Sequence, residues 1–249
     1  MQLEGKVALV TGGTKGIGAA SAVELARRGA DIALIGRHDD EEAAATKAEI
    51  ESRGKRCAVV VADMAKAQDA TRCVEETAER LGPVDVLVHS AGGGFPGGFL
   101  DVDPETWHYA FDVHVHAIYH LCRAAVPGMK QKREGAIVLV SSVAGIRGIP
   151  TAAVYQVVKG AIPQFTRALS LELAENNIRV NAVAPGVIRT RFHEHMTPEQ
   201  KRHNIENRIP LHREGTSEQV ATLVAELATN DYMTGETVVI DGGLTSRIA

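Results

Sequence analysis

Short apolar runs alternate with longer amphipathic segments along the whole chain, and this alternation restricts the fold more than any other feature of the sequence. The runs are rich in β-branched residues and occupy residues 7–10, 32–35, 58–61, 84–88, 136–140, 178–184 and 237–240. Continuous apolar runs of this kind are typical of parallel strands that are covered by helices on both faces.

The segments between the runs have the period of helices, with clear examples at residues 18–28, 40–53, 67–81, 152–174 and 217–227. Strands that alternate with helices predict an α/β fold, here one Rossmann-type, doubly wound domain of about seven parallel strands. We find no internal repeat or linker, so residues 1–249 are predicted to form a single domain. A stretch near residues 186–212 shows few core signals and is predicted to be a substrate lid; the alternative is a pair of surface helices.

Charge and cysteine content exclude several classes of protein. The net charge is −4, both signs are spread along the chain, and no basic stripe suggests nucleic-acid binding. The three cysteines form no CxxC pair, which fits a reducing compartment. The first residues do not resemble a signal peptide, and no apolar run approaches the roughly 18–20 residues of a membrane span. We therefore expect a cytoplasmic protein that binds neither nucleic acid nor membrane.

A glycine-rich loop follows the first predicted strand and leads directly into a helix. Glycines allow a tight turn there and let backbone N–H groups approach a pyrophosphate, while the helix N-terminus supplies further donors. The loop therefore predicts a dinucleotide-binding site. Its candidate cofactor-binding residues are Gly12, Thr14, Lys15, Gly16, Ile17 and Gly18.

The end of the second predicted strand bears on the choice of cofactor. An NAD-specific site usually has a carboxylate there, which binds the adenine ribose 2′-hydroxyl. This chain has Gly36 and then Arg37, whose guanidinium suits a 2′-phosphate, and Lys15 offers a second cation. The pattern favours NADP(H) over NAD(H), which stays the alternative.

Tyr155 and Lys159 are four residues apart on a predicted helix, so their side chains lie on one face. A tyrosine with a pKa near 10 is a poor acid or base at neutral pH, and a neighbouring ammonium favours its phenolate. Ser142 ends the fifth predicted strand, at the sheet edge where ligands bind. These three side chains are the predicted catalytic centre.

Several ordered motifs resemble the short-chain dehydrogenase/reductase family over essentially the whole chain. The matching segments are Thr11-Gly12-x-x-x-Gly16-x-Gly18, Asp63, Ala91-Gly92, Ser142, Tyr155-x-x-x-Lys159, Pro185-Gly186 with Thr190, and Asp241-Gly242-Gly243. The resemblance implies an oxidoreductase (EC 1.1.1.-) that interconverts a carbonyl and an alcohol by hydride transfer. It implies that Tyr155 is the general acid/base, that Ser142 orients the carbonyl, and that Lys159 lowers the tyrosine pKa and holds the nicotinamide ribose.

The same resemblance implies further contacts and an assembly. Two segments, 209–215 and 234–243, look most like bacterial 3-oxoacyl-carrier-protein reductases and small-molecule ketoreductases. Such proteins are usually homotetramers that act on a small-molecule carbonyl or alcohol. The further cofactor-binding residues that it implies are Asp63, Met64, Ser90, Ala91, Gly92, Pro185, Gly186, Ile188 and Thr190.

Two positions depart from the family pattern. Ser90 stands where the family usually has asparagine before Ala-Gly. His114 stands where the family carries an asparagine that kinks a helix and helps to hold a water on the lysine. A histidine there can act as a hydrogen-bonding group or proton shuttle, or it can slow proton relay. We include His114 as a fourth catalytic candidate, and a non-catalytic NADP(H)-binding sensor or scaffold on this fold stays open.

Other signals are weaker. His116 and His120 are four residues apart on a predicted helix, but no acid or cysteine lies at a zinc-motif spacing, so no metal site is predicted. Apolar loop residues either line a substrate pocket or pack in the lid and between subunits. These residues are Phe95, Phe99, Ile146, Ile149, Val187 and Phe192.

Overall fold

Seven parallel strands form one sheet, in the order β3-β2-β1-β4-β5-β6-β7, in the computed structural model, which describes residues 1–190 and 196–246. The strands are β1 (Val7–Thr11), β2 (Asp31–Gly36), β3 (Cys57–Val61), β4 (Val86–His89), β5 (Gly135–Val140), β6 (Ile178–Pro185) and β7 (Thr237–Ile240). The predicted doubly wound fold is confirmed. The order of the strands reverses between β1 and β4, and ligands of such sheets bind at this switch point.

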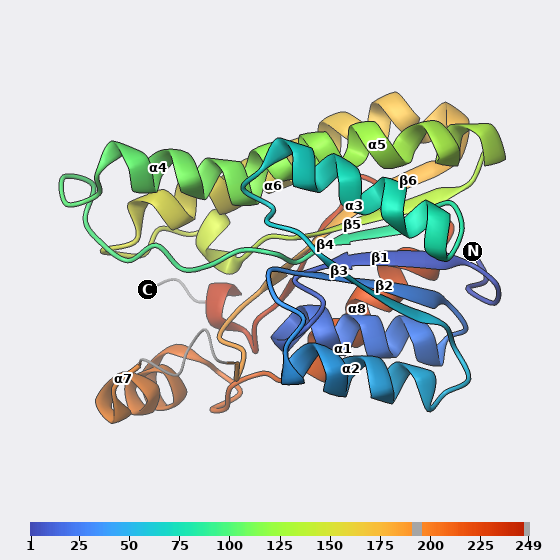
Figure 1. Cartoon of the computed structure of the whole chain (residues 1–249). Coiled ribbons are helices and arrows are strands. Elements are labelled where there is room, and N and C mark those ends of the chain that lie inside the picture. The colour runs from blue at the N-terminus through green and yellow to red at the C-terminus, as the bar shows by residue number, and fades with distance from the viewer. Residues whose placement is uncertain (191–195, 247–249) are drawn as a thin grey trace.

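Helices cover both faces of the sheet (Figure 1). On one face lie α1 (Gly16–Arg27), α2 (Glu41–Glu51) and α8 (Ser217–Thr229). On the other lie α3 (Ala67–Arg80), α4 (Pro104–Phe111), α5 (Ala117–Lys132) and α6 (Ala153–Leu173). Side chains alternate along each strand, so Leu9 joins the core under α3, α5 and α6, whereas Val10 joins the core under α1 and α8. The central strands β1, β4 and β5 are largely apolar because both of their faces are buried.

Side-chain caps explain where several helices begin. The Asp40 carboxylate accepts a hydrogen bond from the Ala43 N–H at 3.0 Å, and Asp103 accepts one from Thr106 at 2.7 Å. Thr216 forms a reciprocal capping box at the start of α8. Each cap satisfies N–H groups that the first helical turn leaves without a partner.

Two departures from α-helical geometry border the predicted site. The π-helical turn η1 (Asp112–His116) joins α4 to α5 and contains His114. In the predicted lid, α7 (Pro198–His203) is followed by the π-helical turn η5 (Asn204–Arg208). Residues 191–195 of that stretch, with Phe192, lie outside the described residues. Among the helices that the structure describes, none combines the length and apolar character that a bilayer span requires.

Candidate active site

The predicted catalytic side chains lie together beside the carboxyl end of β5. Ser142 is the second residue after that strand, and Tyr155 and Lys159 lie one turn apart near the start of α6. Ser142 forms a side-chain hydrogen bond with Tyr155, and the Lys159 ammonium nitrogen lies 5.8 Å from the centre of the Tyr155 ring. The structure therefore brings the three predicted residues into one cluster.

Lys159 is held in place by backbone on both sides. Its Nζ donates to the carbonyl oxygen of Val140 at 2.7 Å, and its own carbonyl accepts from the Ser141 hydroxyl at 2.8 Å. A side chain at Gly145 would place its Cβ 2.6 Å from the Lys159 backbone. The turn after β5 and helix α6 consequently pack closely enough to fix the lysine against the strand end.

Burial governs the protonation of Tyr155 and Lys159. It raises the pKa of Tyr155 above its ordinary value, and the hydrogen bond with Ser142 partly offsets this rise. Burial lowers the pKa of Lys159 to about 7. The tyrosine is thus a protonated donor at neutral pH, and the lysine changes charge near neutrality.

The glycine loop packs too tightly for side chains at two positions. A Cβ on Gly18 would lie 2.1 Å from the Gly12 carbonyl oxygen, and a Cβ on Gly12 would lie 3.0 Å from the backbone of Ala91. Gly12 and Gly16 have φ of 64° and 57°, a region that favours glycine. The loop is thereby drawn against both the end of β4 and the start of α1.

The start of α1 fits an anionic group. Among the described residues no side chain caps the helix at Lys15, and its first turn contains no acidic residue, so its N–H groups have no side-chain acceptor there. Thr190, from the segment after β6, lies next to this start, because its Cγ2 is 3.7 Å from the position of a Cβ on Gly16. The backbone of Gly16 to Gly18 could therefore hold the pyrophosphate of a dinucleotide.

The residues that bear on cofactor choice lie at the end of β2. A Cβ on Gly36 would lie 2.7 Å from the Thr14 methyl group, so this position does not accept a carboxylate side chain without rearrangement. Arg37 is exposed and forms no ion pair or hydrogen bond with the described residues. Lys15 lies 3.5 Å from Glu42, so its charge is partly compensated.

The remaining predicted cofactor residues border the same edge of the sheet. The Asp63 carboxylate, after β3, accepts from the Ala65 N–H at 3.1 Å. Met64 is buried in the core, so a cofactor contact there would have to come from its backbone. Gly186 packs against Asp241, and Ile188 forms an isolated bridge with Gly215.

His114 lies in η1 at the edge of this cluster. The centre of its ring is 6.2 Å from that of Tyr155, in an edge-on arrangement. Its Nε2 lies beside the backbone of Gly93, and burial together with the charge of Lys159 holds its pKa well below the usual range. The imidazole is therefore neutral at physiological pH.

Sequence reasoning missed His89, the last residue of β4. It pairs in register with Thr11 of β1, and its Nδ1 lies 2.9 Å from the Thr11 hydroxyl oxygen. That oxygen also accepts from the N–H groups of Ser90 and Ala91, each at 3.2 Å. Burial lowers the pKa of His89 to about 3, so the imidazole is neutral. Its hydrogen bond with Thr11 joins the ends of two central strands. The sequence signal that could have indicated His89 is its position as a polar residue directly after the apolar run at residues 84–88.

Phe95 packs inward rather than into open space. Its ring contacts Tyr109 and His114 edge-on, and it joins the apolar cluster formed by α4 and α6. Phe99 and Ile146 are exposed. The apolar loop residues were expected either to line a substrate pocket or to pack against other residues, and Phe95 packs.

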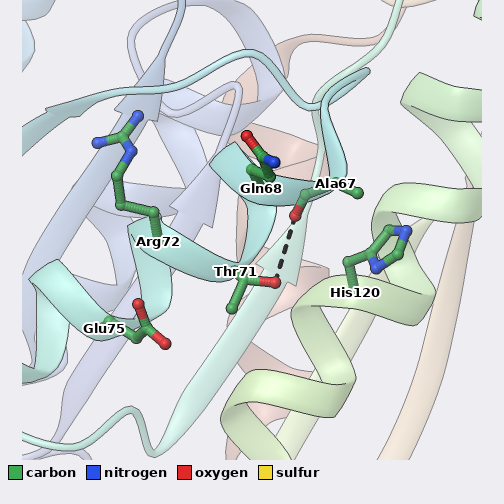
Figure 2. Close-up of a pocket in the computed structure, with 6 residues that line it drawn as sticks. All are labelled: Ala67, Gln68, Thr71, Arg72, Glu75 and His120. Carbon is green, nitrogen blue, oxygen red and sulfur yellow. Dashed lines mark hydrogen bonds between the residues drawn. The ribbon is translucent and has the colours of Figure 1, made fainter.

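One surface hollow lies apart from this cluster. An open hollow of about 360 Å³ between α3 and α5 is lined by residues of α3 and by His120 (Figure 2). It contains none of the predicted site residues.

Across residues 1–190 and 196–246, no group of three or more His, Cys, Asp or Glu side chains is arranged to hold a metal ion.

Comparison with known proteins points to one family. The family described as Enoyl-(Acyl carrier protein) reductase matches residues 12–245. Dehydrogenase/reductase SDR family member 4 of Bos taurus is 38% identical over 252 residues, covering 99% of this chain and 89% of that protein.

Two solved structures share the fold closely. A short-chain type dehydrogenase/reductase from Mycobacterium marinum has a TM-score of 0.92 and 31% identity, with 99% of this chain and 98% of that chain covered. A blue fluorescent protein from a metagenomic library, in complex with NADPH, has a TM-score of 0.89 and 32% identity, with 98% and 99% covered.

Proposed function

Because the chain belongs to the short-chain dehydrogenase/reductase family of oxidoreductases, which bind nicotinamide cofactors, we propose that it is an NADP(H)-dependent enzyme that interconverts a carbonyl and an alcohol. The observation that carries the proposal is the cluster of Ser142, Tyr155 and Lys159, at the same edge of the sheet as the glycine loop. It contains a protonated phenol, a hydroxyl and a buried amine within one turn of helix and one strand end.

In the direction of reduction, Tyr155 donates its proton to the carbonyl oxygen. Its raised pKa keeps the phenol protonated at neutral pH. Ser142 donates a hydrogen bond to the same oxygen, which orients the substrate and stabilises the negative charge that develops there. A nicotinamide dinucleotide, when bound, would supply the hydride for the carbonyl carbon.

Lys159 stabilises the phenolate that remains on Tyr155 after the proton has left. In its protonated form the ammonium lies over the face of the tyrosine ring, at 5.8 Å from its centre. A cation at this distance in a buried site favours the phenolate over the phenol. Oxidation of an alcohol uses the same residues in reverse, with the Tyr155 phenolate as the base.

The preference for NADP(H) rests on the end of β2. Arg37 is exposed there without an ion-pair partner among the described residues, and no acid lies at Gly36 to repel a 2′-phosphate. A guanidinium can bind such a phosphate through two hydrogen bonds. The NADPH complex of the similar blue fluorescent protein is in keeping with this choice.

We further propose that the enzyme works in the cytoplasm as a homotetramer, and that residues near 186–212 close over its small-molecule substrate. The three scattered cysteines motivate the proposed location. The family resemblance motivates the homotetramer, and the few core signals near residues 186–212 motivate the lid.

The function is tested by measuring consumption of NADPH and NADH, by absorbance, across β-ketoacyl thioesters, ketosugars, steroids and simple ketones. We expect turnover of at least one carbonyl, with kcat/KM for NADPH about tenfold or more above that for NADH, as a charge-assisted contact implies. Arg37→Gln should remove most of this preference. Arg53→Gln, at the far end of α2 and paired with Glu49, is the matched control and should keep it. NADPH binding without consumption of any carbonyl would favour a sensor or scaffold instead.

A further inference from the structure

The His114 imidazole is anchored through one of its two nitrogens. Nε2 lies 3.1 Å from the Gly93 carbonyl oxygen and 3.3 Å from the Gly93 nitrogen, so it can donate to the first or accept from the second. Nδ1 is buried and has no hydrogen-bond partner among the described residues. In either neutral tautomer, Nε2 therefore attaches the ring to the segment after β4, residues 92–98.

Gly92 leaves the room that the ring occupies. A Cβ at this position would lie 2.0 Å from Cε1 of His114, far inside contact distance. The backbone of Gly92 and Gly93 consequently follows the edge of the imidazole.

The ring also lies between two aromatic side chains. Its centre is 5.8 Å from that of Phe95, at an interplanar angle of 76°, and 6.2 Å from that of Tyr155, at 81°. Edge-on pairs at these separations are favourable. The His114 ring thus separates Phe95 from Tyr155, the proposed proton donor, and fixes the distance between these two residues.

The far end of the segment is tied to the helix that carries Tyr155. The Gly97 N–H donates to the Thr151 carbonyl at 3.0 Å, and Gly97 forms an isolated bridge with Ala152, just before α6. Thr151 has a φ of 56°, which is rare for a β-branched residue and persists only where the surroundings enforce it. Figure 1 shows the connection between β4 and α4 as a long trace that runs below α4.

His114 is poorly suited to carry a proton. The groups that face it are Lys159 on α6, His89 at the end of β4, and the phenol of Tyr155. Burial and the charge of the lysine both disfavour an imidazolium, so the pKa of His114 lies well below its ordinary value. A group that stays neutral at physiological pH does not gain and release a proton during turnover.

From these contacts we infer that His114 is a positioning residue, which acts through Nε2 by holding residues 92–98 beside Tyr155. This inference rests on the proposed function for its catalytic consequence. The alternative is a role for Nδ1, the ring nitrogen nearer the Cβ. The side-chain amide of an asparagine would reproduce that alternative role.

Two conservative variants separate the roles, because glutamine places a polar atom near the position of Nε2 and asparagine places one near Nδ1. We expect His114→Gln to keep kcat/KM for the carbonyl within about threefold of wild type. His114→Asn and His114→Ala should lose about tenfold, which corresponds to about 1.4 kcal/mol. The pH profile of each active variant should keep its inflections.

A second measurement uses the protein without cofactor or substrate. Hydrogen exchange of the amides of residues 92–98 should accelerate about tenfold in His114→Asn and His114→Ala, but little in His114→Gln. The matched control is His116→Gln, two residues along in η1, where the exposed histidine pairs with Asp112 and its ring centre lies 6.2 Å from that of Phe111. It should change neither exchange nor turnover.

The opposite order, with asparagine retaining activity and slow exchange while glutamine loses both, would overturn the inference. Equal values for all three variants, or a shifted pH inflection in His114→Gln, would also overturn it. If the wild-type protein reduces no carbonyl, the proposed function is overturned. Hydrogen exchange does not depend on turnover, so the comparison of the variants by exchange still decides the role of Nε2.

Discussion

Burial changes the acid–base chemistry of Tyr155 and Lys159 in ways that suit different tasks. Removing the phenol from water disfavours its phenolate and raises the pKa of Tyr155, whereas removing the amine from water disfavours its ammonium and lowers the pKa of Lys159 to about 7. Among the described residues, the Lys159 amine has a backbone carbonyl as its hydrogen-bond partner and no carboxylate as ion-pair partner. A carboxylate would have kept the lysine charged throughout the neutral range.

This shift predicts a pH dependence for the reductive reaction. Lys159 carries its proton below a pKa of about 7 and loses it above, so its support for the Tyr155 phenolate fades as pH rises. We expect kcat/KM for carbonyl reduction to fall above about pH 7. In Lys159→Arg, whose guanidinium stays charged, the rate should be lower but this fall should vanish. A profile for the wild type that is flat from pH 6 to 9 would show that the charge of Lys159 is not used.

At the element scale, the junction of β1 and α1 leaves no room for a side chain between the two backbones. Gly18 lies in the first turn of α1, directly against the Gly12 carbonyl oxygen at the end of β1. This contact brings the helix N-terminus up to the strand end, where its N–H groups can meet a pyrophosphate. Gly128 in α5, by contrast, has no heavy atom within 4 Å of the position of a Cβ.

The two glycines predict opposite effects of the same substitution. Gly18→Ala forces α1 away from β1, so we expect a loss of about 1–3 kcal/mol in the free energy of unfolding and weaker NADPH binding. Gly128→Ala removes a helical glycine without a clash and should raise the free energy of unfolding by about 0.5–1 kcal/mol. Urea denaturation and NADPH titration measure both. If Gly18→Ala bound NADPH as wild type does, the close junction would not matter for the cofactor.

The elements themselves were largely predictable. The apolar run at residues 32–35 became β2 (Asp31–Gly36), and the amphipathic segment at 217–227 became α8 (Ser217–Thr229), with ends that differ by one or two residues. The period of apolar residues reports burial, and burial is what selects these elements. The π-helical turn η1 could not be read in this way, because it depends on how α4 and α5 pack.

For the whole molecule, the sequence predicted which residues gather but not all of their partners. Ser142, Tyr155 and Lys159 could be grouped because one strand end and one helical turn carry them. The contact between Thr11 and His89 depends on the register of β1 against β4, which no local pattern encodes. The place of His114 against Gly93 likewise depends on the path of a connection without regular structure.

The central claim is that Tyr155 delivers the proton in an NADPH-dependent reduction, and the rate of Tyr155→Phe tests it most directly. Phenylalanine keeps the ring and its packing but removes the hydroxyl that contacts Ser142. With a carbonyl that the wild type reduces, kcat should fall at least about a hundredfold, the usual contribution of a general acid, while NADPH affinity stays within about twofold. A variant that binds NADPH normally and keeps more than a few per cent of the wild-type rate would contradict this account.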